Sequence, residues 1–77
     1  MPPKLARVSA EDALRALRRL GFVKVRQRGS HIVMRKETSA GTVCCVVPYR
    51  RDLIPIGTLH SILRQARVTP EEFMENL

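Results

Sequence analysis

The sequence predicts an α+β fold with a helix, three antiparallel strands, a second helix and a short terminal helix. Two observations predict it. Apolar residues recur with a helical period in residues 10–20 and 58–67, and with the strand period of two in residues 22–47. The simplest arrangement is a three-stranded antiparallel meander with both long helices on one face and the other face open.

Length and composition predict one small domain, residues 1–77, with a basic surface. The 77 residues include 14 Lys and Arg against 7 Asp and Glu, a net charge of +7. This size leaves no room for separate cofactor and substrate domains, and we expect no cofactor. A basic balance favours a polyanionic partner, although charge that only keeps a small protein soluble is the alternative. Residues 1–5 lack a signal sequence and no apolar run reaches 18 residues, so we expect a cytosolic protein that does not bind membranes.

The first helix is expected over residues 10–20. Ser9 and Asp12 have the spacing of a capping box, in which the hydroxyl accepts a backbone N–H and the acidic side chain bonds back. Gly21 supplies a left-handed cap at the other end. One stripe of the helix is apolar and carries Ala10, Ala13, Leu14, Leu17 and Leu20.

Two strands joined by a tight turn follow the helix. The first, residues 22–28, alternates Val23 and Val25 with cations and leads into a turn at Gly29. The second, residues 30–36, has Ile32 and Met34 on one face. We expect the valines of the first strand to face the helices.

The third strand, residues 42–47, comes after a polar loop at residues 37–41 and ends at Pro48. It is apolar on both faces and therefore needs cover on both sides. Cys44 and Cys45 are adjacent, so they point to opposite faces and cannot form a loop-closing disulfide. Their spacing does not suit a structural zinc site, and we interpret both as small strand hydrophobes.

Two helices complete the chain. Thr58, after a connector containing Pro55, is the expected N-cap of a helix that runs to about residue 67. Thr69 begins a second capping box with Pro at the first helical position, which predicts a short helix over residues 70–76.

Cations gather on the predicted open face. Alternation places on it Lys24, Arg26 and Arg28 from the first strand and His31 and Arg35 from the second. Together with Lys36 these cations can bind phosphates through charge-assisted hydrogen bonds. A solvated strand face is the alternative. Aromatic residues are too few for a base-stacking sheet, and strands separate the two long helices, which disfavours a helix-turn-helix.

His31 is the candidate catalytic residue. A neutral imidazole can act as a general base near pH 7. Without a metal, such a base can take the proton of an RNA 2′-hydroxyl for in-line attack on the adjacent phosphate. Gly29 would let a phosphate approach the backbone, and Ser30 could donate to it. A lone strand histidine is more often structural or solvated, and we interpret His60 as a surface residue.

Several motifs together resemble the HicA (YcfA-like) family of toxins. They are Gly29-Ser30-His31 after a strand, Val47-Pro48 closing another, Gly57-Thr58-Leu59 followed by Ser61-Ile62-Leu63-Arg64-Gln65-Ala66, and Glu71-Glu72-Phe73. The first triplet is short, but the G-T-L-x-S-I-L-R-Q-A block behind it is distinctive. The likeness spans residues 8–73.

The resemblance implies the toxin of a type II toxin–antitoxin system, a ribosome-independent and metal-independent mRNA endoribonuclease with a double-stranded-RNA-binding-domain-like fold. A HicB-type antitoxin would neutralise it. The catalytic residue would be His31, and our predicted RNA contacts are Lys24, Arg26, Arg28, Gly29, Ser30, Arg35 and Lys36. Arg50 stands where many relatives have a second histidine, and Arg67 where many have glycine. Because no general acid is identified, a non-catalytic double-stranded-RNA-binding module is the alternative.

Overall fold

The structure, a computed structural model, describes residues 5–77; the expectations for residues 1–4, including the absence of a signal sequence there, lie outside this range. Its elements are α1 (Ala10–Arg19), β1 (Val23–Arg28), β2 (His31–Thr38), β3 (Gly41–Pro48), α2 (Ile56–Ala66) and α3 (Pro70–Glu75). The strands form an antiparallel sheet in the order β1-β2-β3. The predicted fold class and element order are confirmed.

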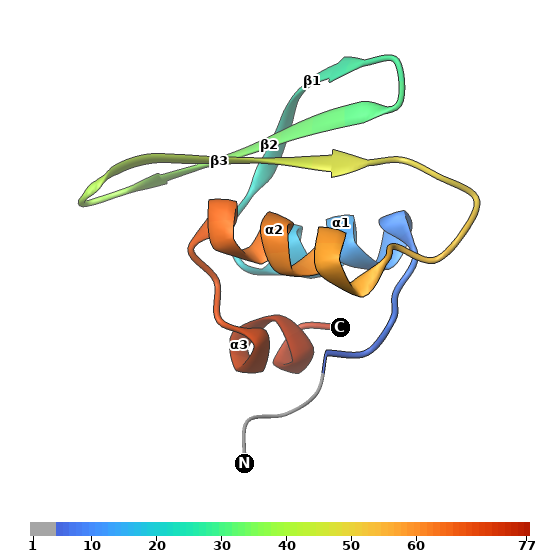
Figure 1. Cartoon of the computed structure of the whole chain (residues 1–77). Helices are drawn as coiled ribbons and strands as arrows, with labels where there is room; N and C mark the ends of the chain where they lie inside the picture. Colours follow the sequence, from blue (N-terminus) through green and yellow to red (C-terminus); the bar gives the residue numbers. More distant parts are fainter. Residues whose placement is uncertain (1–4) are drawn as a thin grey trace.

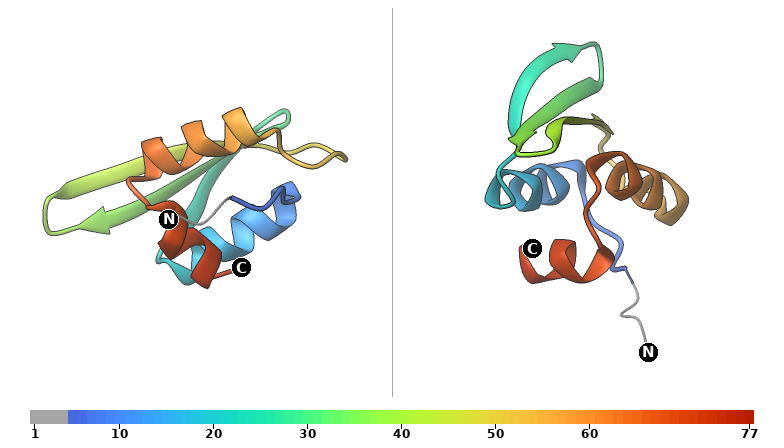
Figure 2. Two further views of the ribbon diagram at one scale, coloured as in Figure 1. Left: turned by 60° about the horizontal axis from the view of Figure 1, so that its bottom comes forward. Right: turned by 90° about the vertical axis from the view of Figure 1, so that its left-hand side faces the viewer.

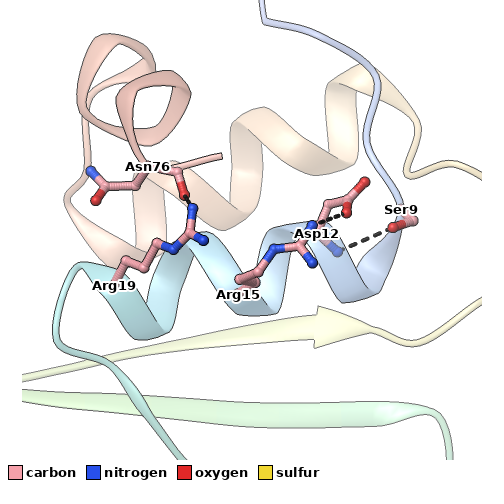
Figure 3. Close-up of polar contacts among 5 residues, drawn as sticks. All are labelled: Ser9, Asp12, Arg15, Arg19 and Asn76. Carbon is pink, nitrogen blue, oxygen red and sulfur yellow. Dashed lines mark hydrogen bonds and ion pairs between the residues drawn. The ribbon is translucent and has the colours of Figure 1, made fainter.

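Three layers make up the molecule (Figure 1). The sheet is the upper layer, α1 and α2 lie together on one of its faces, and α3 lies beneath them. Phe73 of α3 is fully buried and joins this helix to the core. The guanidinium of Arg19 in α1 donates to the carbonyl oxygen of Asn76 at 3.1 Å, which fixes the end of the chain (Figure 3). The opposite face of the sheet is open, as predicted.

The ends of α1 follow the local sequence. The Ser9 hydroxyl accepts the backbone N–H of Asp12 at 3.1 Å. The carboxylate of Asp12 bonds to Arg15 (Figure 3), so only half of the predicted capping box forms. Gly21 has φ +102° and ends the helix, as expected from its lack of a Cβ. At α3, by contrast, Thr69 and Glu72 form the complete capping box.

The β2–β3 hairpin has a shorter turn than the sequence indicates. The predicted loop at 37–41 is wrong, because β2 continues to Thr38 and β3 begins at Gly41, with only Ser39 and Ala40 between them. The Thr38 hydroxyl accepts the N–H of Ala40 at 3.2 Å and donates to the carbonyl of Gly41 at 2.7 Å. These side-chain bonds close a two-residue turn, so residues that look like a polar loop belong to exposed strand ends.

Helix α2 begins before its predicted cap. The N-cap is Pro55, whose carbonyl accepts the N–H of Leu59 at 2.9 Å, and Thr58 lies within the first turn. The prediction that Thr58 caps this helix is wrong, because the fixed φ of Pro55 already sets the chain direction three residues earlier. At the other end Arg67 is left-handed, with φ 55° and ψ 39°. Glycine is the residue that the family resemblance leads us to expect at this position.

The core draws residues from both long helices, from α3, and from β2 and β3. Within residues 5–77, β1 contributes none: all six of its residues are exposed. Val23 and Val25, which we expected to face the helices, are 57% and 44% exposed. The first strand is therefore attached to the molecule through its pairing with β2, and its side chains are free for other contacts.

Candidate functional site

A β-bulge in β1 sets the direction of its side chains. Lys24 lies opposite Met34 and Arg26 lies opposite Val33, so Val25 is an extra residue with no partner on β2. Directly opposed residues in an antiparallel pair share one face of the sheet. An inserted residue therefore reverses which face the alternating side chains occupy on its two sides.

The bulge divides the predicted RNA contacts between the two faces. Arg26 and Arg28 lie on the open face with His31 and Arg35, as predicted. Lys24 lies on the helix side, since its partner Met34 is fully buried there. The prediction that Lys24 faces the open side is wrong. The open face also carries an apolar group of side chains, made up of Val23, Val33, Cys44 and Val46.

His31 begins β2 at the turn of the β1–β2 hairpin, which projects from the body of the molecule (Figure 2). It is exposed, and its partner across the turn is Arg28. Cβ atoms of such pairs are about 5 Å apart, so the imidazole and the guanidinium can contact the same phosphate group. Arg26 is the next cation along this face. The arrangement places an imidazole beside two arginines.

The turn between Arg28 and His31 consists of Gly29 and Ser30. Gly29 has φ +60°, and a Cβ placed there would meet no atom within 4 Å, so its backbone borders open space. The carbonyl of Ser30 accepts the N–H of Tyr49 at 2.6 Å, which ties the turn to the residue after β3. The predicted approach of a phosphate to Gly29 is sterically open.

Arg35 is separated from the histidine. It lies four residues along β2, about 13 Å at the usual rise of a strand. Its Nε lies 3.4 Å from a carboxylate oxygen of Glu37. Arg35 shares the open face with His31, but it cannot contact the same phosphate.

Lys36 faces the helices and has a structural contact. Its Nζ lies 5.8 Å from the centre of the Phe22 ring, and its Cε would lie 3.2 Å from a Cβ placed on Gly21. Phe22 is 2% exposed. The lysine therefore covers a buried aromatic ring with its stem and adds a cation–π contact. Of the five predicted cations, Arg26 and Arg28 are the two beside the histidine.

A groove lies on the helix side of β1, with a volume of about 510 Å³. Its lining comes from α1, from the helix side of the hairpin and from the end of β3: Glu11, Leu14, Arg15, Arg18, Lys24, Gln27, Ile32 and Tyr49. We call it the α1–β1 groove. It exists because the bulge points Lys24 and Gln27 toward α1, and these polar side chains do not close the space as an apolar strand would.

The sequence does not predict that Arg15, Arg18 and Tyr49 line a groove. The pattern Val23-Lys24-Val25-Arg26 alternates without interruption and contains no sign of a bulge. Tyr49 directly follows Pro48, which ends a strand, and this position was the one sign in the sequence that Tyr49 lies near the site. Its hydroxyl donates to Glu11 at 2.6 Å, and this bond, together with the negative charge of Glu11, raises the pKa of the phenol.

The two cysteines point to opposite faces, as predicted. Cys44 is exposed, whereas Cys45 is 1% exposed, and both are free thiols. Burial, with a smaller effect of Cys44, raises the pKa of Cys45 from 9.0 to about 11. Cys45 is therefore an unreactive core residue. His60 lies exposed on α2, as expected.

In residues 5–77, no three His, Cys, Asp or Glu side chains are grouped as a metal site. No helix in the same range is long and apolar enough to cross a membrane.

Comparison with known proteins gives one family. No curated protein matches the chain closely enough to be compared with it. A family model described as HicA toxin of bacterial toxin-antitoxin matches residues 10–68, which include both long helices and the whole sheet. Because the match covers most of the sequence, this chain belongs to the HicA toxin family of bacterial toxin–antitoxin systems.

Proposed function

We propose that this HicA-family chain is a metal-independent endoribonuclease that cleaves mRNA and uses His31 as its general base. The observation that carries the proposal is the pairing of His31 with Arg28 at the open end of the β1–β2 hairpin. A phosphodiester bound by Arg28 and Arg26 would lie beside the imidazole. The neighbouring 2′-hydroxyl of the RNA then supplies the nucleophile.

The proposed reaction balances without a cofactor. His31 takes the proton of the 2′-hydroxyl, the 2′-oxygen bonds to phosphorus, and the bond from phosphorus to the 5′-oxygen breaks. Arg50, at the position where the resemblance places a second histidine, does not release its proton. Water therefore protonates the leaving 5′-oxygen, and the hydroxide formed takes the proton held by His31, which restores the neutral imidazole. The products are a 2′,3′-cyclic phosphate and a 5′-hydroxyl. Arg28 stabilises the charge that develops on the phosphate oxygens.

His60, the other histidine of this chain, provides a matched control for this function. His31→Ala should lower the single-turnover rate of RNA cleavage by at least about 100-fold, the usual contribution of a general base. His60→Ala should retain the wild-type rate, because His60 lies exposed on α2. Both variants should keep the circular dichroism spectrum and melting temperature of the wild type. Equal cleavage by His31→Ala and wild type would rule out the catalytic role.

A non-catalytic double-stranded-RNA-binding module is the second candidate, and Arg50 is the observation that favours it. Without the second histidine, the basic hairpin could bind RNA by shape and charge alone. The same samples separate the two functions. A module binds RNA with steep salt dependence, yields no product, and loses little affinity when His31 becomes alanine.

The antitoxin partner is proposed to cover the open face. Val23 and Val46 there are 57% and 37% exposed, beside Arg26 and Arg28. A HicB-type partner with an acidic contact surface would bury the valines, neutralise the arginines and cover His31. Hydrogen exchange of the complex should show protection at β1, at the turn and on β3. Protection that avoids both His31 and the hairpin cations would contradict this mode of inhibition.

A further inference from the structure

The α1–β1 groove lies on the helix side of the hairpin, whereas His31 lies on its open side. We propose that the groove binds one nucleotide of the RNA substrate, adjacent to the scissile phosphate, so that the RNA strand bends around the end of the hairpin. The inference rests on the proposed function in one respect, namely that RNA is the ligand. It adds a second contact surface, with its own residues, to the site of cleavage.

The charge of the groove favours a phosphate. In residues 5–77 the ion pairs are Arg15 with Asp12 and Arg35 with Glu37, which leaves Arg18 and Lys24 without an acidic partner. Glu11 is the acidic residue of the lining, and it already accepts the hydroxyl of Tyr49. Two unpaired cations that face one groove repel each other, and a bound phosphate relieves that repulsion.

Lys24 is connected to the turn before His31. Its Nζ donates to the side-chain oxygen of Gln27 at 2.8 Å, and the Gln27 amide donates to the carbonyl of Gly29 at 3.1 Å. Gln27 and Ile32 on the groove side are the chain neighbours of Arg28 and His31 on the open side. A strand that passes the exposed backbone of Gly29 therefore enters the groove directly after leaving His31.

Tyr49 supplies a surface for a base. Tyr49 is 42% exposed, its backbone N–H donates to the carbonyl of Ser30 at 2.6 Å, and its hydroxyl donates to Glu11 at 2.6 Å. A tyrosine held by its backbone and by its hydroxyl loses little conformational freedom when a base stacks on its ring. Leu14 and Ile32 give the groove apolar walls. Its volume of about 510 Å³ falls in the range of small-molecule sites.

The test measures RNA binding separately from cleavage. In a His31→Ala background, Arg18→Gln and Lys24→Gln are compared with Arg64→Gln, which removes an exposed arginine from α2. The probe is a fluorescein-labelled single-stranded RNA oligonucleotide, with affinity measured over a series of salt concentrations. The slope of the logarithm of the binding constant against the logarithm of the salt concentration measures the number of phosphate contacts. Each groove variant should reduce the size of this slope by about 0.7, the value for one phosphate contact to a single strand, and Arg64→Gln should leave it unchanged.

Two Tyr49 variants test the base contact. Tyr49→Ala should weaken binding about tenfold, as expected for the loss of one stacked base, and Tyr49→Phe should restore it. If Tyr49 instead only positioned the turn through Glu11, phenylalanine would fail to restore binding, which would overturn the stacking role.

The outcomes distinguish this inference from the nuclease proposal. If the wild type fails to cleave RNA but the groove variants lose affinity, the groove is correct and the nuclease is wrong. Groove variants that bind RNA like the parent while cleavage still requires His31 overturn the groove. The groove proposal is also overturned if the groove variants no longer bind an acidic antitoxin but still bind RNA. That result would assign the groove to the protein partner.

Discussion

Lys24 of β1 lies directly opposite the fully buried Met34 of β2, so a lysine and a core methionine share the helix-facing side of the sheet. One extra residue, Val25, produces this pairing. It separates Lys24, which lines the groove beside α1, from Arg26 and Arg28, which lie on the open face with His31. Positive charge therefore lies on both sides of the hairpin.

Arg28 and Arg35 should have unequal effects on cleavage, although both are open-face arginines. Arg28→Ala should lower kcat by about 100-fold, because Arg28 is the cross-turn partner of His31 and can contact the reacting phosphate. Arg35→Ala should change kcat by less than about threefold, because Arg35 pairs with Glu37 far along the strand. Steady-state kinetics on one RNA substrate compares them, and equal losses in kcat would refute the assigned positions.

Arg67→Gly should stabilise the fold. Arg67 has φ 55°, a left-handed conformation that costs a residue with a Cβ about 1 kcal/mol. Removing that cost should raise the melting temperature by about 4 °C or more. Arg67→Ala is the control, since it removes the charge and keeps the Cβ. A gain with alanine as large as with glycine would mean that charge, rather than backbone strain, is the cause.

Ser9→Ala and Thr58→Ala should differ in stability. The Ser9 hydroxyl accepts the N–H of Asp12, so alanine should cost about 1 kcal/mol of unfolding free energy. Thr58 lies inside the first turn of α2 and caps nothing, so its replacement should stay within about 0.5 kcal/mol. Urea unfolding of both variants measures the difference. A larger loss for Thr58→Ala would restore that threonine as the cap.

Stability should fall as the pH rises from about 9 to about 11, in part because of Cys45. Its pKa is 9.0 when unperturbed and about 11 in the folded protein, so the unfolded chain releases this proton first. Deprotonation then favours unfolding, by about 3 kcal/mol once the pH passes the folded value. Cys45→Ala should lower stability below pH 9, because it leaves a cavity in the core, and should make the decline between pH 9 and pH 11 shallower. Parallel pH curves for the two proteins would contradict a buried, protonated Cys45.

The elements of this fold could be predicted because their signals are local. Ser9, Gly21 and Thr69 act on their own helix ends, and each occupies the position that the sequence indicates. The direction of the β1 side chains depends on register against β2, which is a non-local property. The prediction for Lys24 is therefore wrong because Val25 has no partner on β2.

The candidate site could be predicted in part for the same reason. Arg28 and His31 flank a two-residue turn, and sequence alone brings such neighbours together. Lys36 looks like the other cations of the segment, yet its contact with Phe22 joins residues from different elements. The α1–β1 groove likewise depends on how far β1 stands from α1, and no pattern within either segment records that separation.

In the proposed mechanism, His31 takes the proton of an RNA 2′-hydroxyl. Mass spectrometry of the fragments from one RNA oligonucleotide, incubated with the wild type or with His31→Ala in the presence of a chelator, tests it most directly. We predict fragments ending in 2′,3′-cyclic phosphate and beginning with 5′-hydroxyl for the wild type, and intact RNA for the variant. Fragments with 3′-hydroxyl and 5′-phosphate ends, or the same fragments from His31→Ala, would contradict the claim.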